Sequence, residues 1–346
     1  MYRIQVAGDL KLMKKFFIFS LAILIVITNV SCAKTKSAFH FDTNKLKVAL
    51  VIRESLSDSS RDTEAYSGLK RFETDYGAGI AVVEKVGLED AKAVFAELVE
   101  KKFNLILANG YEYGKILKRR AKMYPDTFFC VIGGETVQEP NLCSFGFKDE
   151  QYGYLIGAVA GLNTSTNKVG IIVGDKIPPI ERTIIGMRNG LKSVNPKADL
   201  VVSYINSFND INKGKEAAIS QINTGVDVIT HLADQSGIGV IKAAEESDTS
   251  VIGAVIDQHD LAPSTVITSG IQDVSQLVYL ACQYYVEEAL EPVIFRFGLK
   301  NQVIDLTPSY GNIDPTTESR INRVKSTLID QEVRETQDET TKKNKK

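Results

Sequence analysis

The sequence predicts an α/β fold made of two doubly wound lobes, each with a parallel sheet. Short β-branched runs alternate with longer stretches of helical periodicity, which is typical of βαβ units with helices on both faces of a sheet. The chain has 346 residues, more than one ordinary core accommodates. The alternation also begins again near Lys168. Two lobes account for these observations better than one wide sheet.

The first lobe is predicted from short apolar strands followed by polar loops and amphipathic helices. Strands are expected at residues 47–52, 80–86, 104–108, 128–132 and 142–147, and helices at 62–76, 88–101 and 111–123.

The second lobe repeats this pattern. In the helix expected at 149–163, Tyr152, Leu155 and Val159 share one stripe, and Pro178 and Pro179 suit the first turn of the next helix. The expected strands are 168–173, 200–204, 226–231, 250–255, 265–268 and 302–306, and the expected helices are 149–163, 178–194, 209–223, 236–247, 271–289 and 315–331.

The N-terminus has the pattern of a secretory signal. Met13, Lys14 and Lys15 precede an apolar run at 16–27, and small residues follow it. The run is too short for a comfortable membrane span, so we do not expect a permanent transmembrane anchor.

Cys32 stands where a bacterial lipoprotein carries its acylated cysteine, with Ser31 suited to the preceding position and Asn29 in place of the usual Leu. We therefore expect palmitate-type acylation of Cys32, which would hold the protein on a lipid bilayer. Cleavage of a plain signal peptide nearby is the alternative. The expected organisation is a signal peptide at 1–32, a polar tether at 33–45, a first lobe at 46–147 plus 258–292, a second lobe at 148–257 plus 293–331, and a disordered tail at 332–346.

Composition excludes several classes of function. The formal net charge is only −2 and no basic face is evident, so nucleic acid is not an expected partner. The three histidines have no Cys or His partner at metal-ligand spacing, so we expect neither a metal nor a cofactor. No catalytic motif is present, and we expect no enzymatic activity. Cys130, Cys143 and Cys282 read as buried small hydrophobic residues rather than a disulfide framework, although a Cys130–Cys143 bridge stays open.

Ligands of open α/β sheets bind outside the carboxyl ends of the strands, and the space between two lobes is the natural pocket. Each polar residue at such a position can also be a solvated loop residue or a helix cap, whereas Phe208 has little reason to be there unless it packs on something. The candidates from this rule are Arg53, Ser60, Arg61 and Asp62 after the first strand, Asn109 and Tyr111 after the third, and Phe208, Asp234 and Asp257 in the second half.

From about Lys47 to Glu318 the chain resembles the basic membrane protein family, which includes purine-nucleoside receptor lipoproteins. The resemblance lies in four stretches: "KVGIIVGDKIPPIERTIIGMRNGLKSVNP", "YINSFNDINKGKEAA", "GVDVITHLADQSGIGVIKAA" and "GAVIDQHDLAPSTVITS". It implies a type I periplasmic-binding-protein-like fold and a solute passed to the membrane subunits of an ABC importer.

The resemblance also implies that the ligand site is altered. Phe208, a stacking residue, is retained, as are Asp58, Ser60, Asp257 and Gln258. The changed positions are Arg61 for a Phe that stacks on the base, Asp62 for an Asn, Arg53 for an Asp, Lys115 near a sugar-contacting Asp, Asp234–Gln235 for a Gly pair, Val255 for an Asp, and Gln272 for a Lys that contacts ribose.

These observations favour a membrane-anchored lipoprotein of the bacterial envelope that binds a purine nucleoside or a related metabolite for an ABC importer. It would lie on the periplasmic face of the inner membrane or on the cell surface. The alternative is a surface lipoprotein that binds host matrix, since the resemblance implies adhesive roles for some members and a degraded pocket would favour such a role.

Overall fold

The computed structural model describes residues 46–56 and 61–343, with side chains as far as Arg334. The predicted signal peptide and tether, Cys32 and Ser60 lie outside these residues. Within them, no helix combines the length and apolar composition required to cross a membrane.

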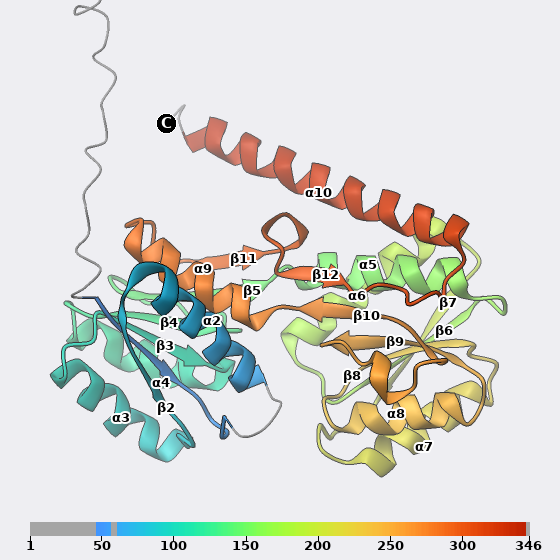
Figure 1. Cartoon of the computed structure of the whole chain (residues 1–346), viewed down its shortest axis with the longest axis horizontal. Coiled ribbons are helices and arrows are strands. Elements are labelled where there is room, and N and C mark those ends of the chain that lie inside the picture. The colour runs from blue at the N-terminus through green and yellow to red at the C-terminus, as the bar shows by residue number, and fades with distance from the viewer. Residues whose placement is uncertain (1–45, 57–60, 344–346) are drawn as a thin grey trace, which may run out of the picture. The chain divides into compact units, whose positions relative to one another are not determined.

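The first lobe is built on a six-stranded sheet in the order β11-β5-β4-β3-β1-β2, and all its strand pairs are parallel (Figure 1). Its four central strands, β1, β3, β4 and β5, are almost fully buried, as expected when helices cover both faces of a parallel sheet, whereas the edge strands β2 and β11 are partly exposed. The strands are β1 (Lys47–Val51), β2 (Gly79–Val83), β3 (Leu105–Asn109), β4 (Phe128–Ile132), β5 (Leu142–Phe147) and β11 (Ile294–Phe297).

Helices cover both faces of this sheet. On one face, α2 approaches α9 so closely that a Cβ on Gly68 would lie 2.1 Å from the Ser275 carbonyl oxygen. On the other face, Phe95 and Leu117 pack against Phe129 of β4 in one apolar cluster. The helical elements of this lobe are α2 (Arg61–Tyr76), α3 (Leu88–Glu100), η2 (Tyr111–Tyr113), α4 (Gly114–Arg120), η3 (Ala121–Met123) and α9 (Val274–Val286).

The second lobe is built on a six-stranded sheet in the order β12-β10-β9-β8-β6-β7, in which only β12 is antiparallel to its neighbour among the described strands. The strands are β6 (Lys168–Val173), β7 (Asp199–Tyr204), β8 (Val228–Leu232), β9 (Ser250–Val255), β10 (Val266–Gln272) and β12 (Ile304–Leu306).

Two helix pairs cover this second sheet. In the first pair, α5 and α6 touch backbone to backbone, since a Cβ on Gly157 would lie 2.1 Å from the Met187 carbonyl oxygen. The second pair, α7 and α8, closes the apolar cluster around Ile172 and Ile229. The helical elements are α5 (Asp149–Asn163), α6 (Pro178–Val194), α7 (Ile211–Ile222), α8 (Ser236–Glu245), η4 (His259–Leu261), η5 (Leu299–Asn301) and α10 (Pro315–Lys343).

The predicted fold class is confirmed, but two strands lie in the other lobe from the one expected. β10 falls within 258–292 and joins the second sheet, pairing with β9, while β11 falls within 293–331 and joins the first sheet, pairing with β5. Local pattern identifies a strand, whereas its sheet is decided by the strand with which it pairs, which is the neighbouring β9 for β10 and the distant β5 for β11. β11 was not predicted at all.

The predicted disordered tail is also wrong for residues 332–343, because α10 continues to Lys343. The stretch from residue 334 to residue 346 lacks apolar residues, a composition that predicts disorder. Glu332 nevertheless is buried, with only 3% of its surface exposed, and it forms polar contacts with the body of the protein.

The polar residues inside the lobes are few and mostly paired. Cys130, Cys143 and Cys282 are buried free thiols, as predicted. His231, at the end of β8, is 2% exposed, and its Nε2 lies 2.9 Å from the Gln258 side-chain oxygen. Its Nδ1 is buried and has no hydrogen-bond partner in the described structure. Burial lowers the pKa of His231 to about 4, so the neutral ring donates from Nε2 to Gln258.

We therefore expect His231 to make folding sensitive to mild acid. The folded pKa lies below the unfolded value of about 6.5, so the stabilising contribution is complete above pH 6.5 and is lost as pH falls toward 4. By pH 4 the loss should reach roughly 3 kcal/mol. His231→Gln should flatten the free energy of unfolding between pH 7 and pH 4.5, measured by urea denaturation. His259→Gln is the matched control, and an unchanged pH profile in His231→Gln would contradict the expectation.

Candidate functional site

The two sheets share a strand order that places a topological switch point at the carboxyl edge of each lobe. In both sheets the strand order, counted along the chain, follows the 2-1-3-4-5 pattern. The direction in which strands are added to the sheet therefore reverses between β1 and β3 in the first lobe and between β6 and β8 in the second. Ligands of such sheets bind at these switch points. The described candidates Arg53, Asn109 and Asp234 follow strands that border them, so the topology brings the predicted residues to the predicted edges.

Asp62 and Asn109 bind each other. The Asp62 carboxylate accepts a 2.6 Å hydrogen bond from Asn109 Nδ2 and a 2.9 Å bond from the Glu54 backbone N–H. Both residues are less than 10% exposed. In the described structure they fix the loop after β1 to the end of β3, and their role in ligand binding stays a prediction.

Arg53 and Tyr111 are accessible. The Arg53 guanidinium pairs with Glu112 at 3.3 Å and its side chain is 55% exposed, while Tyr111 is 62% exposed. Burial does not fix the position of either side chain, so neither is preorganised for ligand recognition.

Arg61, the first residue of α2, carries the positive charge of this region. Its guanidinium carbon lies 5.8 Å from the ring centre of Phe147, at the end of β5. Burial raises the pKa of Asp234 and of Tyr152, both of which belong to the second lobe, and the charge of Arg61 partly opposes that rise in each. Arg61 is thus a first-lobe cation whose field reaches the second lobe.

In the second lobe Phe208 lies on a glycine. A Cβ on Gly174, just after β6, would lie 2.3 Å from the Phe208 ring, so the ring fits only because residue 174 is glycine. The Phe208 carbonyl accepts from the Ser236 N–H at 3.0 Å, which joins this loop to the start of α8.

Asp234 lies between β8 and α8 with a φ of 44°. Its side chain is exposed, yet the protein around it disfavours ionisation and raises its pKa, against the opposing charge of Arg61. A carboxylate in this environment would be stabilised by a hydrogen-bond donor that approaches it.

Val255 ends β9 in a strained conformation. Its φ is 71°, and the Ile256 N–H donates to the Ala254 carbonyl at 2.8 Å, which closes a tight γ-turn around Val255. A β-branched residue rarely adopts positive φ. The Val255 N–H also donates to the Tyr152 hydroxyl at 3.3 Å.

The two remaining candidates differ in accessibility. Asp257 is exposed and accepts hydrogen bonds from the Tyr310 hydroxyl and from the His259 N–H. Gln272 ends β10 opposite Ile304 of β12 and is 7% exposed.

Glu64, one turn into α2, was not predicted. One of its carboxylate oxygens is buried and has no hydrogen-bond partner in the described structure. Burial raises the pKa of Glu64 to about 7, while Arg61 lowers it and Asp273 raises it further. No local pattern distinguishes this Glu; the close approach of α2 to α9 buries it.

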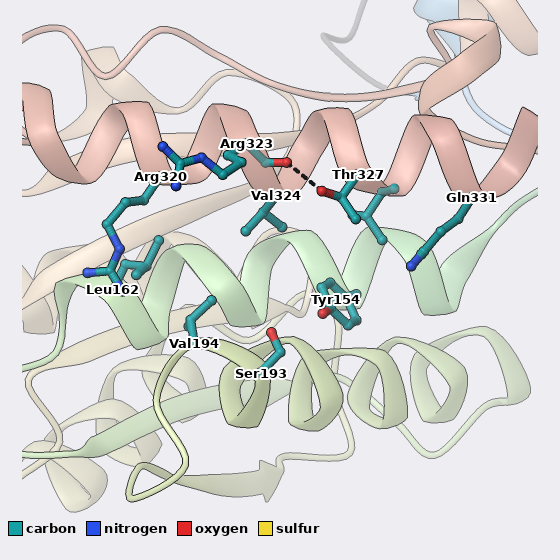
Figure 2. Close-up of a pocket in the computed structure, with 10 residues that line it drawn as sticks. Tyr154, Leu162, Ser193, Val194, Arg320, Arg323, Val324, Thr327 and Gln331 are labelled. Atoms are coloured by element: carbon teal, nitrogen blue, oxygen red, sulfur yellow. Dashed lines mark hydrogen bonds between the residues drawn. The ribbon is translucent and has the colours of Figure 1, made fainter.

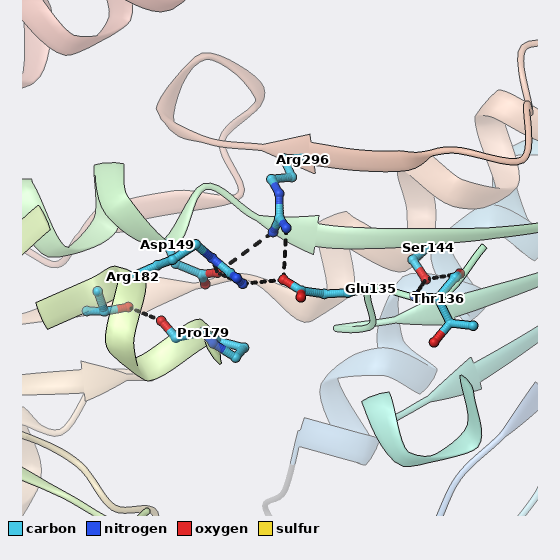
Figure 3. A network of polar contacts seen from close by, with 8 residues as sticks. Glu135, Thr136, Ser144, Asp149, Pro179, Arg182 and Arg296 are labelled. Carbon is cyan, nitrogen blue, oxygen red and sulfur yellow. Dashed lines mark hydrogen bonds and ion pairs between the residues drawn. The ribbon is translucent and has the colours of Figure 1, made fainter. Parts of the chain in front are cut away.

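A network of four charges that sequence reasoning also missed joins the two lobes (Figure 3). Glu135 and Arg296 belong to the first lobe, and Asp149 and Arg182 to the second. Arg182 donates to Asp149 at 2.7 Å and pairs across the lobes with Glu135. Arg296 donates to Glu135 at 2.8 Å and lies 3.9 Å from Asp149 across the lobes.

The pKa values of the two acids in this network shift in opposite directions. Burial raises the pKa of Asp149 despite the hydrogen bonds from Arg182. Burial acts in the same sense on Glu135, but hydrogen bonds and charges from Arg296 and Arg182 outweigh it and lower the pKa of Glu135. Glu135 is therefore held ionised between two guanidinium groups that come from different lobes.

A separate groove of about 280 Å³ lies between α10 and the α5–α6 pair (Figure 2). Tyr154, Val194 and Val324 line it, with Arg320 and Arg323 at its side. None of the predicted site residues lines it. Within the described residues, no group of three or more His, Cys, Asp or Glu side chains is arranged to hold a metal ion.

We expect Asp62 to be required for the order of the β1 loop. Asp62→Ala would leave the Glu54 N–H and the Asn109 amide without their acceptor, at a cost of about 1–3 kcal/mol in the free energy of unfolding. Urea denaturation measures this loss. Asp90→Ala, which removes an exposed first-turn acid of α3, is the control; equal losses in the two variants would mean that the Asp62 contacts carry no special weight.

Known proteins resemble this chain over most of its length. It is 30% identical over 301 residues to a CD4+ T-cell-stimulating antigen of Listeria monocytogenes, covering 81% of this chain and 84% of that protein. It is 31% identical over 281 residues to basic membrane protein B of Borrelia garinii subsp. bavariensis, covering 77% and 82% of the two chains.

Solved structures agree. The structure titled as a transcriptional activator of the comK gene from Bacillus halodurans matches with a TM-score of 0.73 and 27% identity, covering 82% of this chain and 97% of that one. An ABC transporter solute-binding protein from Aeropyrum pernix K1 matches with a TM-score of 0.69 at 21% identity, covering 83% and 92%, which supports the fold.

The sequence model of one family covers nearly the whole described chain, from residue 45 to residue 345. Its members are substrate-binding proteins and not enzymes, as predicted for this chain. The chain belongs to the family of PnrA-like substrate-binding proteins of ABC transporters.

Proposed function

We propose that this protein is a lipid-anchored receptor of the bacterial envelope that binds a purine nucleoside or a related metabolite between its lobes and delivers it to the membrane subunits of an ABC importer. Membership of the family supports the transport role. The observation that carries the ligand class is Phe208, an aromatic ring held over Gly174 at the carboxyl edge of the second sheet.

The chemistry of the cleft favours a planar ligand. Phe208 offers an aromatic face, and the Arg61 guanidinium is itself planar and stacks well on rings. A base held by such groups gains about 1–3 kcal/mol from each stacking contact. Asp234 adds an acceptor whose raised pKa marks incomplete solvation.

The same cleft has fewer side chains that can bind a ribose than the resemblance implies for the sites of its relatives. Val255 has no side-chain acceptor, and Gln272 carries no charge. Since a site rejects or loses ligands when hydroxyl partners are missing, we propose that nucleosides bind weakly or that a related metabolite is preferred. No feature of the described residues favours the matrix-binding alternative, and we do not propose it.

Calorimetric titration with adenosine, guanosine and inosine tests the ligand class. We expect measurable binding with dissociation constants weaker than about 1 µM, and Phe208→Ala should weaken it by roughly 5- to 100-fold because a stacking contact is lost. Ile219→Ala, an exposed apolar residue of α7, is the control. Submicromolar binding would mean that the substitutions cost less than argued. The absence of any binding would exclude a nucleoside ligand.

Metabolic labelling with palmitate tests the anchor. We expect the full-length protein to incorporate label through Cys32 and the Cys32→Ala variant to lose it, because the cysteine is the residue to which the lipid is attached. A Cys130→Ala variant, which removes a buried thiol, is the control. Label that persists in Cys32→Ala would exclude the proposed attachment site.

A further inference from the structure

We infer that the C-terminal helix α10 restrains the hinge between the lobes, which consists of the segments that connect the two sheets. The helix does so through the contacts of Glu332. The proposal goes beyond ligand recognition and does not depend on it, because it rests on contacts within the protein. It concerns how readily the two lobes move relative to each other.

α10 is fixed first to the second lobe. Ile321 and Leu328 are buried, at 5% and 8% exposure, and Lys325 pairs with Asp305 of β12. Figure 2 shows this part of the helix lying along α5. The first half of α10 therefore moves with the second lobe.

Farther along the helix, Glu332 reaches the segments through which the chain passes between sheets. Its carboxylate accepts from the Gln151 side-chain amide at 3.1 Å and from the Lys300 backbone N–H at 3.3 Å, and it lies 3.3 Å from the Lys148 ammonium. Only 3% of Glu332 is exposed, so water cannot easily replace these partners.

Two of these partners belong to different crossings. Lys148 links β5 of the first sheet to α5 of the second lobe, and Lys300 lies in η5, between β11 of the first sheet and β12 of the second. Gln151 joins the same crossings, since its oxygen accepts from the Leu299 N–H at 2.8 Å. One carboxylate thus ties two hinge segments to each other and to α10.

The consequence follows from how hinged proteins move. Lobes open and close through φ and ψ changes in a few connecting residues. A buried carboxylate that holds a backbone N–H in one such segment and an ammonium in another opposes those changes, and charge-assisted bonds are stronger than neutral ones. α10 therefore stiffens the hinge through Glu332.

The test uses the full chain without ligand. Hydrogen–deuterium exchange is compared in the wild type, Glu332→Gln, Glu332→Ala and Asp330→Asn, the last being an exposed acid on the same helix. We expect the amides of Leu299 and Lys300 to exchange about 5-fold faster in Glu332→Gln and at least about 10-fold faster in Glu332→Ala. Asp330→Asn should match the wild type.

The exchange rates of interior amides distinguish a local restraint on the hinge from general stabilisation of the fold. Amides of β6 should keep their wild-type exchange rates in every variant. If β6 and the hinge segments accelerate together in both Glu332 variants, Glu332 only contributes to overall stability and the proposal is wrong. Unchanged exchange at Leu299 and Lys300 in Glu332→Ala would overturn it as well.

Lobe motion is measured directly with spin labels at Lys92→Cys on α3 and Lys213→Cys on α7, one in each lobe. The parent protein, labelled in parallel, reports any signal from native cysteines. We expect Glu332→Ala to broaden the distance distribution between the labels, and Asp330→Asn to leave it unchanged. An identical distribution in all variants would show that the helix does not control the hinge.

Discussion

Every covalent link between the two lobes passes through a few short crossings, and the organisation of the protein depends on them. The chain leaves the first sheet after β5, returns to it after β10, and leaves it again after β11. Crossings of this kind fix the edge along which the sheets face each other but leave rotation about that edge easy. Noncovalent contacts at the crossings must therefore set the relative position of the lobes, and the four-charge network of Glu135, Asp149, Arg182 and Arg296 is the most connected of those described.

The network and the cleft divide the charged residues between two tasks. In the network, acids and bases from both lobes neutralise one another, so little net field remains there. In the cleft, Arg61 acts on Asp234 and Glu64 through its charge. In the site proposed above, the charge of Arg61 is thus available to a ligand, whereas the four charges of the network sum to zero.

Local sequence was sufficient for most elements of the fold. The strands at 128–132, 142–147, 168–173 and 250–255 have the predicted bounds, since a short run of apolar, aromatic or β-branched residues between turn residues is a local signal. The sheet to which a strand belongs is not a property of its own residues: β10 pairs with the preceding strand β9, whereas β11 pairs with the distant β5, and neither choice is visible in the local pattern. The local pattern likewise places Glu332 in a polar tail, although it is buried and contacts Lys148 and Lys300. The candidate site was predictable as a set of positions, from the rule on carboxyl ends of strands. What each side chain does there was not, since Asp62 and Asn109 satisfy each other and one carboxylate oxygen of the half-buried Glu64 is enclosed without a partner in the described structure.

The turn at Val255 has a consequence for how the proposed site can evolve. Asp, Asn and Gly adopt positive φ at lower cost than Val, so the backbone at this position is already shaped for residues that the chain does not use. Replacement by Asp would relieve conformational strain and add a carboxylate in one step. A polar group gained in a binding site usually lowers the stability of the fold. At this position the stability and the number of polar groups would increase together. In the site proposed above, position 255 is therefore a point at which a polar group can be gained without a compensating change elsewhere.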